Sequence, residues 1–416
     1  MQPGNPVLPG RGFVAERLLA PRQAMVAFFA RVELAVPQTE RTPLAHALGR
    51  ILAEDICADE DYPRAPRSVM DGFAIAAADV PGELPIVGDV RMGEGAGSVL
   101  RRGAAMRIPT GGTLPPGADA VVPIEDVRLE GEGIVVGAPV AIGENVIETG
   151  ADMRRGETVL SPGRRLHAPE IGVLATLGVT NVPVYRRPVI AVLSSGDELV
   201  APHRRPVGGQ IRDSNRYAVA ASLELMGAQP RHYPTLRDEA DEFEAALDRA
   251  IDECDAVVVT GGSSVGERDR LPRAVEAIAR PGVVVHGLRL KPGKPTLFGA
   301  HGAKPIVGLP GNPTSALMVL EAVAAPVIAA LTGAPIEPAT VNAHLAQPAL
   351  SRIGWTWYIP VAVHEDGGRL LADPLALRSF SVSLTARANG YVVMGEAEEE
   401  WPAATLVTVH RFLGGS

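Results

Sequence analysis

Polar loops that follow β-branched strands are the parts of this sequence whose residues could do chemistry. The segment 256–269, AVVVTGGSSVGERD, places Gly261, Gly262 and Ser263 directly after three valines and ends at Asp269. Such a valine run is typical of a buried parallel strand, and glycines after it let the backbone approach a ligand closely. An ordinary turn between a strand and a helix is the alternative, and this segment alone does not decide between the two.

Three further loops share this character: SSGDEL with Glu198, LKPGKPTLFG with Lys291 and Lys294, and GLPGNPTSA. The carboxyl ends of parallel strands meet at one edge of a sheet, so all four loops should border one crevice. Lysines there would bind an oxyanion as point charges, and the carboxylates of Glu198 and Asp269 could hold a Mg²⁺ that bridges the same ligand. A solvated turn is the alternative for the lysines, but the prolines beside them restrict the chain and favour a preformed anion site.

The loop GLPGNPTSA precedes a long apolar segment that predicts a helix. Thr314 or Ser315 would cap that helix, and the free backbone amides at its start would carry roughly half a positive charge. Capping does not explain the prolines, glycine and asparagine that come before it, which fix one backbone path. The predicted binding residues here are Pro310, Asn312, Pro313 and Ser315.

Three isolated polar residues are further candidates. Asp71 stands beside Gly72 in SVMDGFAI, and Thr110 precedes a glycine pair in RIPTGGTLPPGADAVV. On this pattern alone, Asp71 fits an Asx turn better than catalysis. Asp238 begins a helical segment, where capping explains the residue as well as chemistry does.

The elements around these residues predict an α/β multidomain protein of four parts. Alternating strands and helices at 187–335 predict a doubly wound α/β domain with right-handed crossovers. Short apolar runs separated by Pro and Gly predict a β-rich inserted domain at 58–155 and a β-barrel-like C-terminal domain at 336–416. The stretches 15–57 and 156–186 show helical spacing, including a helix around Leu44 and Leu48, and we expect them to form one discontinuous helical domain.

Composition restricts the class of partner. The 416 residues have a formal net charge of −9 and contain no basic run, so neither nucleic acid nor an anionic membrane is an expected partner. The two cysteines, Cys57 and Cys254, lack the number and spacing of a disulfide framework or a metal site, which fits a reducing compartment. The N-terminal residues lack a secretory pattern, and the most membrane-like segment, 316–334, contains Glu321 and Pro326 and predicts a buried helix. We expect a cytoplasmic protein.

Eight segments in one order carry a family resemblance. They are GRILAEDI, SVMDGFA, RIPTGGTLPPGADAVV, SSGDEL, QIRDSNR, TGGSSVGERD, KPGKP and GLPGNPTSA. Together they resemble the molybdopterin molybdenumtransferase family, which includes the gephyrin E domain, over about 16–335. TGGSSVGERD, KPGKP and GLPGNP alone also resemble the molybdopterin adenylyltransferase domain, which shares the α/β fold. That domain lacks the MDGFA and PTGG segments, so the insert favours the first family.

The resemblance implies a four-domain, elongated homodimer that takes adenylylated molybdopterin and molybdate, with Mg²⁺, and releases molybdenum cofactor and AMP. Implied protein partners are the molybdopterin adenylyltransferase and chaperones of downstream molybdoenzymes. The family's functional positions fall on Asp71, Thr110, Glu198, Asp238, Asp269, Lys291, Lys294, Pro310 and Pro313. The two lysines would hold the oxyanion, Glu198 and Asp269 would position Mg²⁺ on the pyrophosphate, and Asp71 and Thr110 would come from the partner subunit's insert.

Two departures from the family pattern remove cations. Ile147 in ENVIETGAD and Pro360 in WTWYIPV stand where the family usually has arginine, which would weaken oxyanion binding. The arginines that could substitute are Arg154, Arg155, Arg378 and Arg387. The alternatives to a molybdenum insertase are therefore a divergent paralogue acting as a pterin-binding carrier or scaffold, and an adenylyltransferase.

Overall fold

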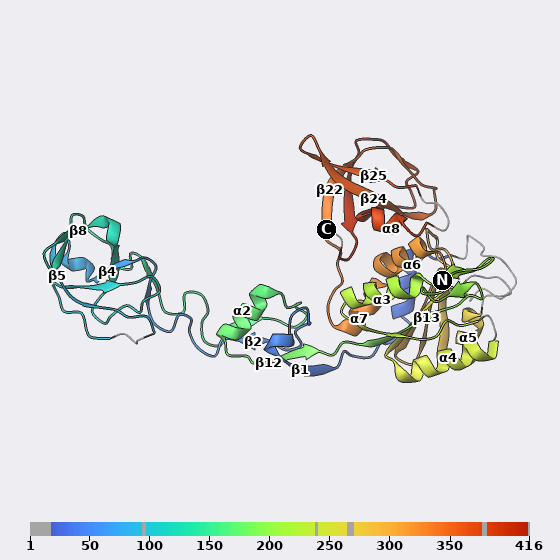
Figure 1. Cartoon of the computed structure of the whole chain (residues 1–416), viewed down its shortest axis with the longest axis horizontal. Coiled ribbons are helices and arrows are strands. Elements are labelled where there is room, and N and C mark those ends of the chain that lie inside the picture. Colours follow the sequence, from blue (N-terminus) through green and yellow to red (C-terminus); the bar gives the residue numbers. More distant parts are fainter. Residues whose placement is uncertain (1–17, 94–96, 238–239, 264–269, 377–380, 415–416) are drawn as a thin grey trace. The chain divides into compact units, whose positions relative to one another are not determined.

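The computed structural model describes residues 18–93, 97–237, 240–263, 270–376 and 381–414. The chain divides into two compact units. One contains residues 54–162 and 168–180, and the other contains residues 1–53, 163–167 and 181–416. The first unit corresponds to the predicted insert with the helix that follows it, and the second holds the α/β and C-terminal parts (Figure 1).

A six-stranded sheet forms the centre of the larger unit. Its order is β16 (Gln229–His232), β13 (Val189–Ser194), β17 (Ala256–Thr260), β21 (Lys304–Leu309), β20 (Leu297–His301) and β18 (Pro281–His286). The first four strands are parallel, whereas β20 runs antiparallel to both of its neighbours. The predicted loop LKPGKPTLFG therefore ends in a strand, and only its first part is free to border a site.

Alternate residues of β17 enter two different apolar cores. Val258 packs with helices α1 (Pro21–Phe29), α3 (Asn215–Leu225), α6 (Pro313–Val319) and α7 (Ala325–Thr332). Val257 and Val259 pack on the opposite side with α4 (Ala240–Glu253) and α5 (Leu271–Ile278). Because successive strand residues point to opposite faces, a strand covered on both faces must be apolar throughout. The doubly wound α/β domain is confirmed.

The apolar helical run after β21 lies in this core. It comprises α6, the π-helical turn η5 (Leu320–Ala324) and α7, and it ends at Gly333, whose φ is 82°. Among the described residues, this run is the only one long and apolar enough to cross a membrane, and 67% of its most apolar window is buried inside the protein. The predicted buried helix is confirmed.

A closed sheet forms the C-terminal part of the same unit. Its strands are β22 (Thr340–Leu345), β24 (Thr356–Asp366), β25 (Arg369–Pro374), β26 (Gly390–Met394) and β28 (Leu406–Arg411). Because β24 pairs with both β25 and β26, the sheet closes on itself and the barrel-like prediction is confirmed. One further strand, β19 (Leu290–Lys291), comes from the lysine loop and pairs with β24, so the loop is part of this sheet. Beside the barrel lie β23 (Ala349–Leu350), β27 (Glu400–Trp401) and α8 (Leu384–Arg387).

The smaller unit is built on another six-stranded sheet, as predicted for a β-rich insert. Its order is β7 (Ala120–Pro123), β4 (Gly72–Ile75), β6 (Ala105–Ile108), β5 (Gly82–Asp89), β9 (Gly133–Val136) and β8 (Val127–Glu130). Shorter elements of this unit are β2 (Ile56–Cys57), β3 (Arg67–Ser68), η3 (Ala77–Asp79), η4 (Ile124–Asp126), β10 (Val146–Ile147), β11 (Thr158–Leu160) and α2 (Ala168–Thr176).

The expected discontinuous helical domain is only partly helical. Its two stretches do pair, but through strands: β1 (Thr39–Pro43) with β12 (Asn181–Tyr185), and β2 with β11. The predicted helix around Leu44 and Leu48 is wrong, because only the single turn η2 (Leu44–His46) forms between Pro43 and Gly49, whose φ is 74°. The division into 15–57 with 156–186, 58–155, 187–335 and 336–416 stays a prediction.

Candidate functional site

Two adjoining cavities lie at the carboxyl ends of β13, β17 and β21. The smaller, of about 450 Å³, contains Lys291 and Lys294, and we call it the lysine cavity. The larger, of about 890 Å³, contains Glu198 and Asp213, and we call it the carboxylate cavity. Pro295 and Asn312 line both. The edge of the sheet expected to bind a ligand therefore has two neighbouring compartments.

Glycines shape the floor of the carboxylate cavity. Gly261 has a φ of 85°, and a Cβ there would lie 2.4 Å from the carbonyl oxygen of Ser195, so only glycine fits between β13 and β17. A Cβ on Gly196 would lie 2.6 Å from Oε2 of Glu198. The exposed Glu198 carboxylate thus occupies space that Gly196 leaves open. Gly262 and Ser263 also line this cavity, so the glycine loop borders it, and its role in binding stays a prediction.

A buried polar chain supports this floor. Thr260 donates from Oγ1 to Ser194 Oγ at 3.2 Å, and Ser194 donates to Oδ1 of Asp213 at 3.2 Å. Asp213 is only 1% exposed, and its Oδ2 lies 3.6 Å from Nε of Arg216. No described residue donates a hydrogen bond to that Oδ2. Asp213 was not assigned a role from the sequence, although it belongs to the segment QIRDSNR that carried part of the resemblance.

The segment containing Asp213 also holds Glu198 in place. The two-residue strands β14 (Leu199–Val200) and β15 (Ile211–Arg212) pair beside the cavity. The backbone amide of Ile211 donates to the carbonyl of Glu198 at 2.8 Å. Glu198 is therefore fixed at the backbone while its carboxylate stays exposed to the cavity.

The start of α6 forms the boundary between the cavities. The predicted caps were Thr314 or Ser315, but the N-cap is Asn312, whose side-chain oxygen accepts from the amide of Ser315 at 3.4 Å. Thr314 instead donates to the carbonyl of Ser381 at 2.6 Å. Pro313 occupies the first helical turn, where its missing N–H is not needed. Asn312 and Ser315 line the lysine cavity and Pro313 lines the carboxylate cavity, whereas Pro310 is buried and lines neither.

The lysine cavity is cationic. Its described lining contains Lys291, Lys294 and Arg352 and no carboxylate. Lys291 Nζ lies 6.0 Å from the centroid of the Trp357 ring and has no ion-pair partner among the described residues. A lining of two lysines and one arginine makes this cavity suited to an anion.

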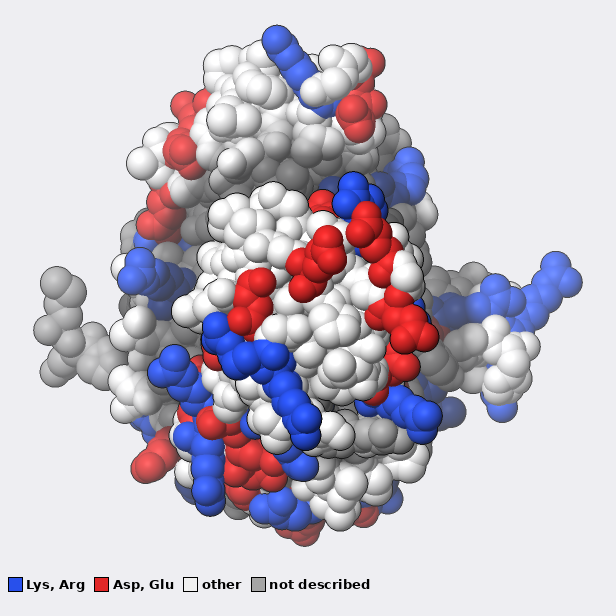
Figure 2. Space-filling model, turned by 90° about the vertical axis from the view of Figure 1, so that its left-hand side faces the viewer, with Lys and Arg blue, Asp and Glu red and all other residues white. Residues whose placement is uncertain are grey.

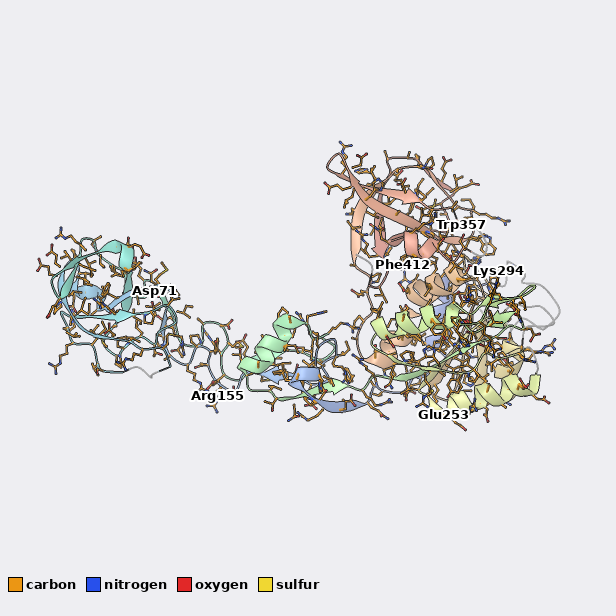
Figure 3. All side chains as sticks on the ribbon, in the orientation of Figure 1. Asp71, Arg155, Glu253, Lys294, Trp357 and Phe412 are labelled. Atoms are coloured by element: carbon orange, nitrogen blue, oxygen red, sulfur yellow. The ribbon has the colours of Figure 1, made fainter. Side chains whose placement is uncertain are left out.

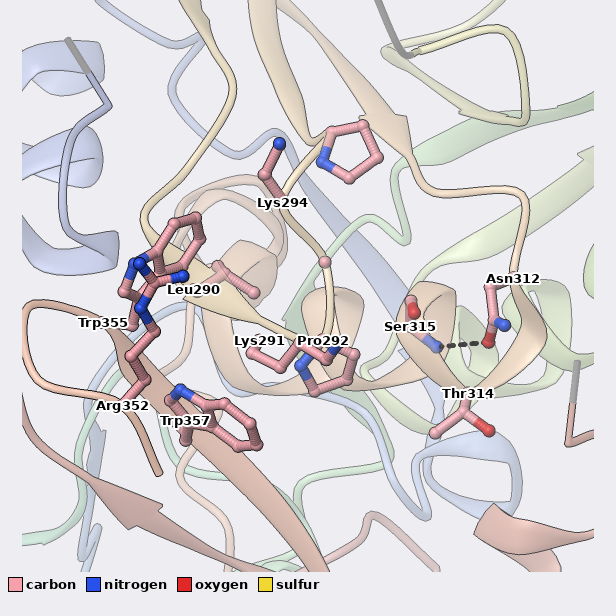
Figure 4. A pocket seen from close by; sticks show the side chains of 12 residues that line it. Leu290, Lys291, Pro292, Lys294, Asn312, Thr314, Ser315, Arg352, Trp355 and Trp357 are labelled. Carbon is pink, nitrogen blue, oxygen red and sulfur yellow. Dashed lines mark hydrogen bonds between the residues drawn. The ribbon is translucent and has the colours of Figure 1, made fainter. Parts of the chain in front are cut away.

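Three lining residues of the lysine cavity come from the C-terminal part and were missed by sequence reasoning. They are Arg352, Trp355 and Trp357 (Figure 4). No local sequence signal marks them, because their positions follow from the pairing of β19 with β24. Pro360, where the family arginine was expected, is a buried position of β24 opposite Tyr391. Of the suggested substitutes, Arg387 is an exposed residue of α8 that lines neither cavity, and Arg378 lies outside the described residues.

Asp71 and Thr110 lie together in the smaller unit, whereas Lys294 and Trp357 belong to the larger (Figure 3). Asp71 Oδ1 accepts from the amide of Thr110 at 2.7 Å and from its hydroxyl at 3.0 Å. These two hydrogen bonds, the backbone one first, hold the pKa of the Asp71 carboxyl below its ordinary value. The carboxylate is bonded to the turn that follows β6, not to its own turn, so the Asx-turn reading of Asp71 is wrong. Ile147 is in β10 of the same unit and is 41% exposed, and Arg154 and Arg155 also belong to that unit.

Two predicted site residues, Asp238 and Asp269, lie outside the described residues. No group of three His, Cys, Asp or Glu side chains that could hold a metal occurs in the part of the chain that the structure describes. The face drawn in Figure 2 carries acidic and basic side chains interspersed, without a continuous basic surface.

Comparisons with known proteins agree with this arrangement. Residues 19–178 match the family model of the MoeA N-terminal region (domain I and II), and residues 191–330 match a probable molybdopterin binding domain. A molybdopterin molybdenumtransferase of Bacillus subtilis is 33% identical over 86% of each chain. One of Haemophilus influenzae is 36% identical over 90% of this chain and 94% of the relative.

Solved structures give the same result for the fold. A molybdopterin biosynthesis MoeA protein from Pyrococcus horikoshii has a TM-score of 0.83 at 28% identity, covering 95% of this chain and 100% of that one. A second crystal structure of such a protein has a TM-score of 0.79 at 30% identity, covering 95% and 99%.

Proposed function

Since the chain belongs to the molybdopterin molybdenumtransferase family, and so to molybdenum cofactor biosynthesis, we propose that it inserts molybdate into adenylylated molybdopterin and releases AMP. The observation that carries the proposal is the pair of cavities that share Pro295 and Asn312. One cavity is cationic and suits an oxyanion, and the other combines carboxylates with glycine backbone and suits a nucleotide phosphate. Substrates that occupy both cavities would place the molybdate next to the pyrophosphate of the adenylylated pterin.

In the lysine cavity, the lysines would bind molybdate and orient it. Their charges reduce the repulsion between the oxyanion and the anionic sulfurs of the pterin substrate, because opposite charges attract strongly where water is partly excluded. Asn312 fixes the first turn of α6, so the amides there keep one position relative to the anion. The proposed result is a preorganised oxyanion site with Lys291 and Lys294 as its charges.

In the carboxylate cavity, Glu198 would help to hold Mg²⁺, and Asp269 is the second proposed ligand. Mg²⁺ is usually bound by one or two carboxylates together with substrate phosphates and water. The exposed Glu198 carboxylate is suited to be one of these ligands. When bound, the ion would neutralise charge on the pyrophosphate. The Glu198 carboxylate could also accept a proton from the water that cleaves the phosphoanhydride bond.

The remaining parts of the proposal concern assembly and location. We propose a homodimer in which Asp71 and Thr110 reach the cleft of the partner subunit, because this hydrogen-bonded pair is exposed at the surface of its own unit. The adenylyltransferase that supplies the substrate and the chaperones that receive the cofactor are the proposed protein partners. The cytoplasm is the proposed location, and the free state of Cys57 and Cys254 is consistent with it.

Purified protein with adenylylated molybdopterin, molybdate and Mg²⁺ tests the proposal. AMP should appear together with cofactor that activates a cofactor-free molybdoenzyme, and both should depend on Mg²⁺. Tight pterin binding without AMP release would instead identify a carrier or scaffold. ATP-dependent adenylylation of free molybdopterin would identify an adenylyltransferase. The same assay with tungstate in place of molybdate measures the preference between the two oxyanions.

A further inference from the structure

One wall of the lysine cavity comes from the C-terminal barrel. Figure 4 shows Arg352, Trp355 and Trp357 on one side of the cavity and Asn312, Thr314 and Ser315 on the other. Backbone pairing fixes this wall against the lysine loop, because Lys291 is the partner of Trp357 in the β19–β24 ladder. The amide of Thr356 also donates to the carbonyl of Arg289 at 3.1 Å. The wall and the lysines therefore keep one relative position.

The aromatic character of this wall is unusual for the chain. Aromatic residues make up only 4% of the sequence, yet two of the three tryptophans line this one cavity. Trp357 and the third tryptophan, Trp401, both pack against the barrel core, and Trp401 also donates to Glu398 at 2.9 Å. The side chain of Trp355 makes no hydrogen bond, ion pair or ring contact within the described residues, and it is only partly buried. Its ring is available to a ligand.

The chemistry of the lining exceeds what a tetrahedral oxyanion needs. Such an ion is bound by cations and amides alone, whereas indole rings provide flat apolar faces that stack on planar heterocycles. Arg352 is exposed at the same wall, has no ion-pair partner in the described part of the chain, and can pair with a negative group attached to such a ring. A cavity of about 450 Å³ is also in the size range of sites for molecules larger than a simple ion.

We propose that Trp355 and Trp357 hold the fused ring of the pterin substrate and that Arg352 binds the negative charge attached to it. The identity of the ring rests on the proposed function, whereas a planar anionic heterocycle follows from the lining alone. The three residues would then determine specificity for the pterin, beside the lysines that bind the oxyanion.

Fluorescence titration of the full chain tests the proposal without turnover. The probes are 6-hydroxymethylpterin, its phosphate ester and molybdate alone, and the signals are indole and pterin quenching. Both pterins should bind, and Trp355→Ala should weaken both by about tenfold because a stacking surface is lost. Trp355→Phe should keep most of the affinity. Arg352→Ala should weaken only the phosphorylated pterin, also by about tenfold.

Ile353→Ala is the matched control. Ile353 is 54% exposed in the same turn and does not line the cavity, so this variant should bind both pterins like the wild type. Unchanged pterin binding in a folded Trp355→Ala protein would overturn the proposal, and so would quenching by molybdate but by neither pterin. AMP release that does not depend on Trp355 would refute this inference and leave the proposed function intact. Pterin binding that depends on Trp355, without any AMP release, would support this inference and refute the proposed function.

Discussion

Arg289 in the lysine loop and Glu396 in the barrel form a two-pronged ion pair. Nε of Arg289 donates to Oε1 of Glu396 at 2.9 Å, and a second guanidinium nitrogen donates to Oε2 at 3.1 Å. Arg289 directly precedes β19, the strand that carries Lys291. The side chains are 26% and 36% exposed, so the pair contributes only about 0–1 kcal/mol to folding. Its main effect is to fix the lysines relative to the barrel.

Breaking this pair should affect binding more than stability. Arg289→Ala and Glu396→Ala should each raise the KM for molybdate by about three- to tenfold, because a displaced lysine loses orientation. The unfolding temperature should change little. The exchanged pair, Arg289→Glu with Glu396→Arg, should recover most of the loss. If the exchanged variant has a KM for molybdate as high as the single variants have, the ion pair does not position the loop.

Asp71→Ala should abolish most turnover while leaving the protein folded. The carboxylate is exposed and, among the described residues, bonds only to Thr110, in the exposed turn after β6, so little packing is lost. Asp126→Ala, at an exposed acid of the same unit, is the control and should keep full activity. Thr110→Val should raise the pKa of the Asp71 carboxyl toward its ordinary value only in part, because the amide of residue 110 still donates. Carboxyl titration by NMR measures the shift.

Asp213→Ala should destabilise the larger unit by about 2–3 kcal/mol, since it removes the buried partner of Ser194 and Arg216. Chemical denaturation measures the loss. Glu130→Ala removes the partner of Arg128 in an exposed ion pair and should cost less than about 0.5 kcal/mol. If the two substitutions lower the free energy of unfolding equally, the buried polar chain of Thr260, Ser194 and Asp213 does not stabilise the fold more than an exposed ion pair does.

Arginine at the two departures from the family should have unequal effects on folding. Pro360 is buried in β24, so Pro360→Arg places an unpaired charge in the barrel and should destabilise it by about 3 kcal/mol or more. Ile147 is 41% exposed, so Ile147→Arg should stay within about 0.5 kcal/mol of the wild type. Thermal unfolding of both variants measures the contrast. A well-folded Pro360→Arg protein with tighter molybdate binding would show that the barrel can still accept the family arginine.

Glu321 should make stability depend on pH. Burial raises the pKa of its carboxyl, while hydrogen bonds from the amide of Leu413 and from Ser222 act in the opposite direction. A raised pKa in the folded state gives a contribution that is complete below the ordinary value of 4.5 and is lost as pH rises through the folded-state pKa. The free energy of unfolding of the wild type, relative to Glu321→Gln, should therefore fall as the pH rises from 4.5 through the raised folded-state pKa. Ser222→Ala removes a hydrogen bond that lowers the pKa of Glu321, so it should move the loss of stability to higher pH. If the unfolding free energy of the wild type relative to Glu321→Gln instead rises with pH, the pKa of Glu321 is not raised.

The sequence determined the features that depend on local pattern. The valine run of β17 required a strand covered on both faces, because no residue in it tolerates water on either side. The ordered motifs identified the family. Strand and family could be predicted because side-chain periodicity and motif order are written along the chain.

Only the tertiary structure decided which distant residues complete the site. Trp355 and Arg352 reach the lysine cavity because β19 pairs with β24, a contact between segments more than sixty residues apart that no local pattern encodes. Asp71 and Thr110 meet because β4 pairs with β6 and brings the turns at their ends together, whereas the sequence alone favoured an isolated turn. The helix expected near Leu44 failed because Pro43 and Gly49 limit it to one turn. Contacts across the fold depend on strand pairing and packing, and these are properties of the folded chain.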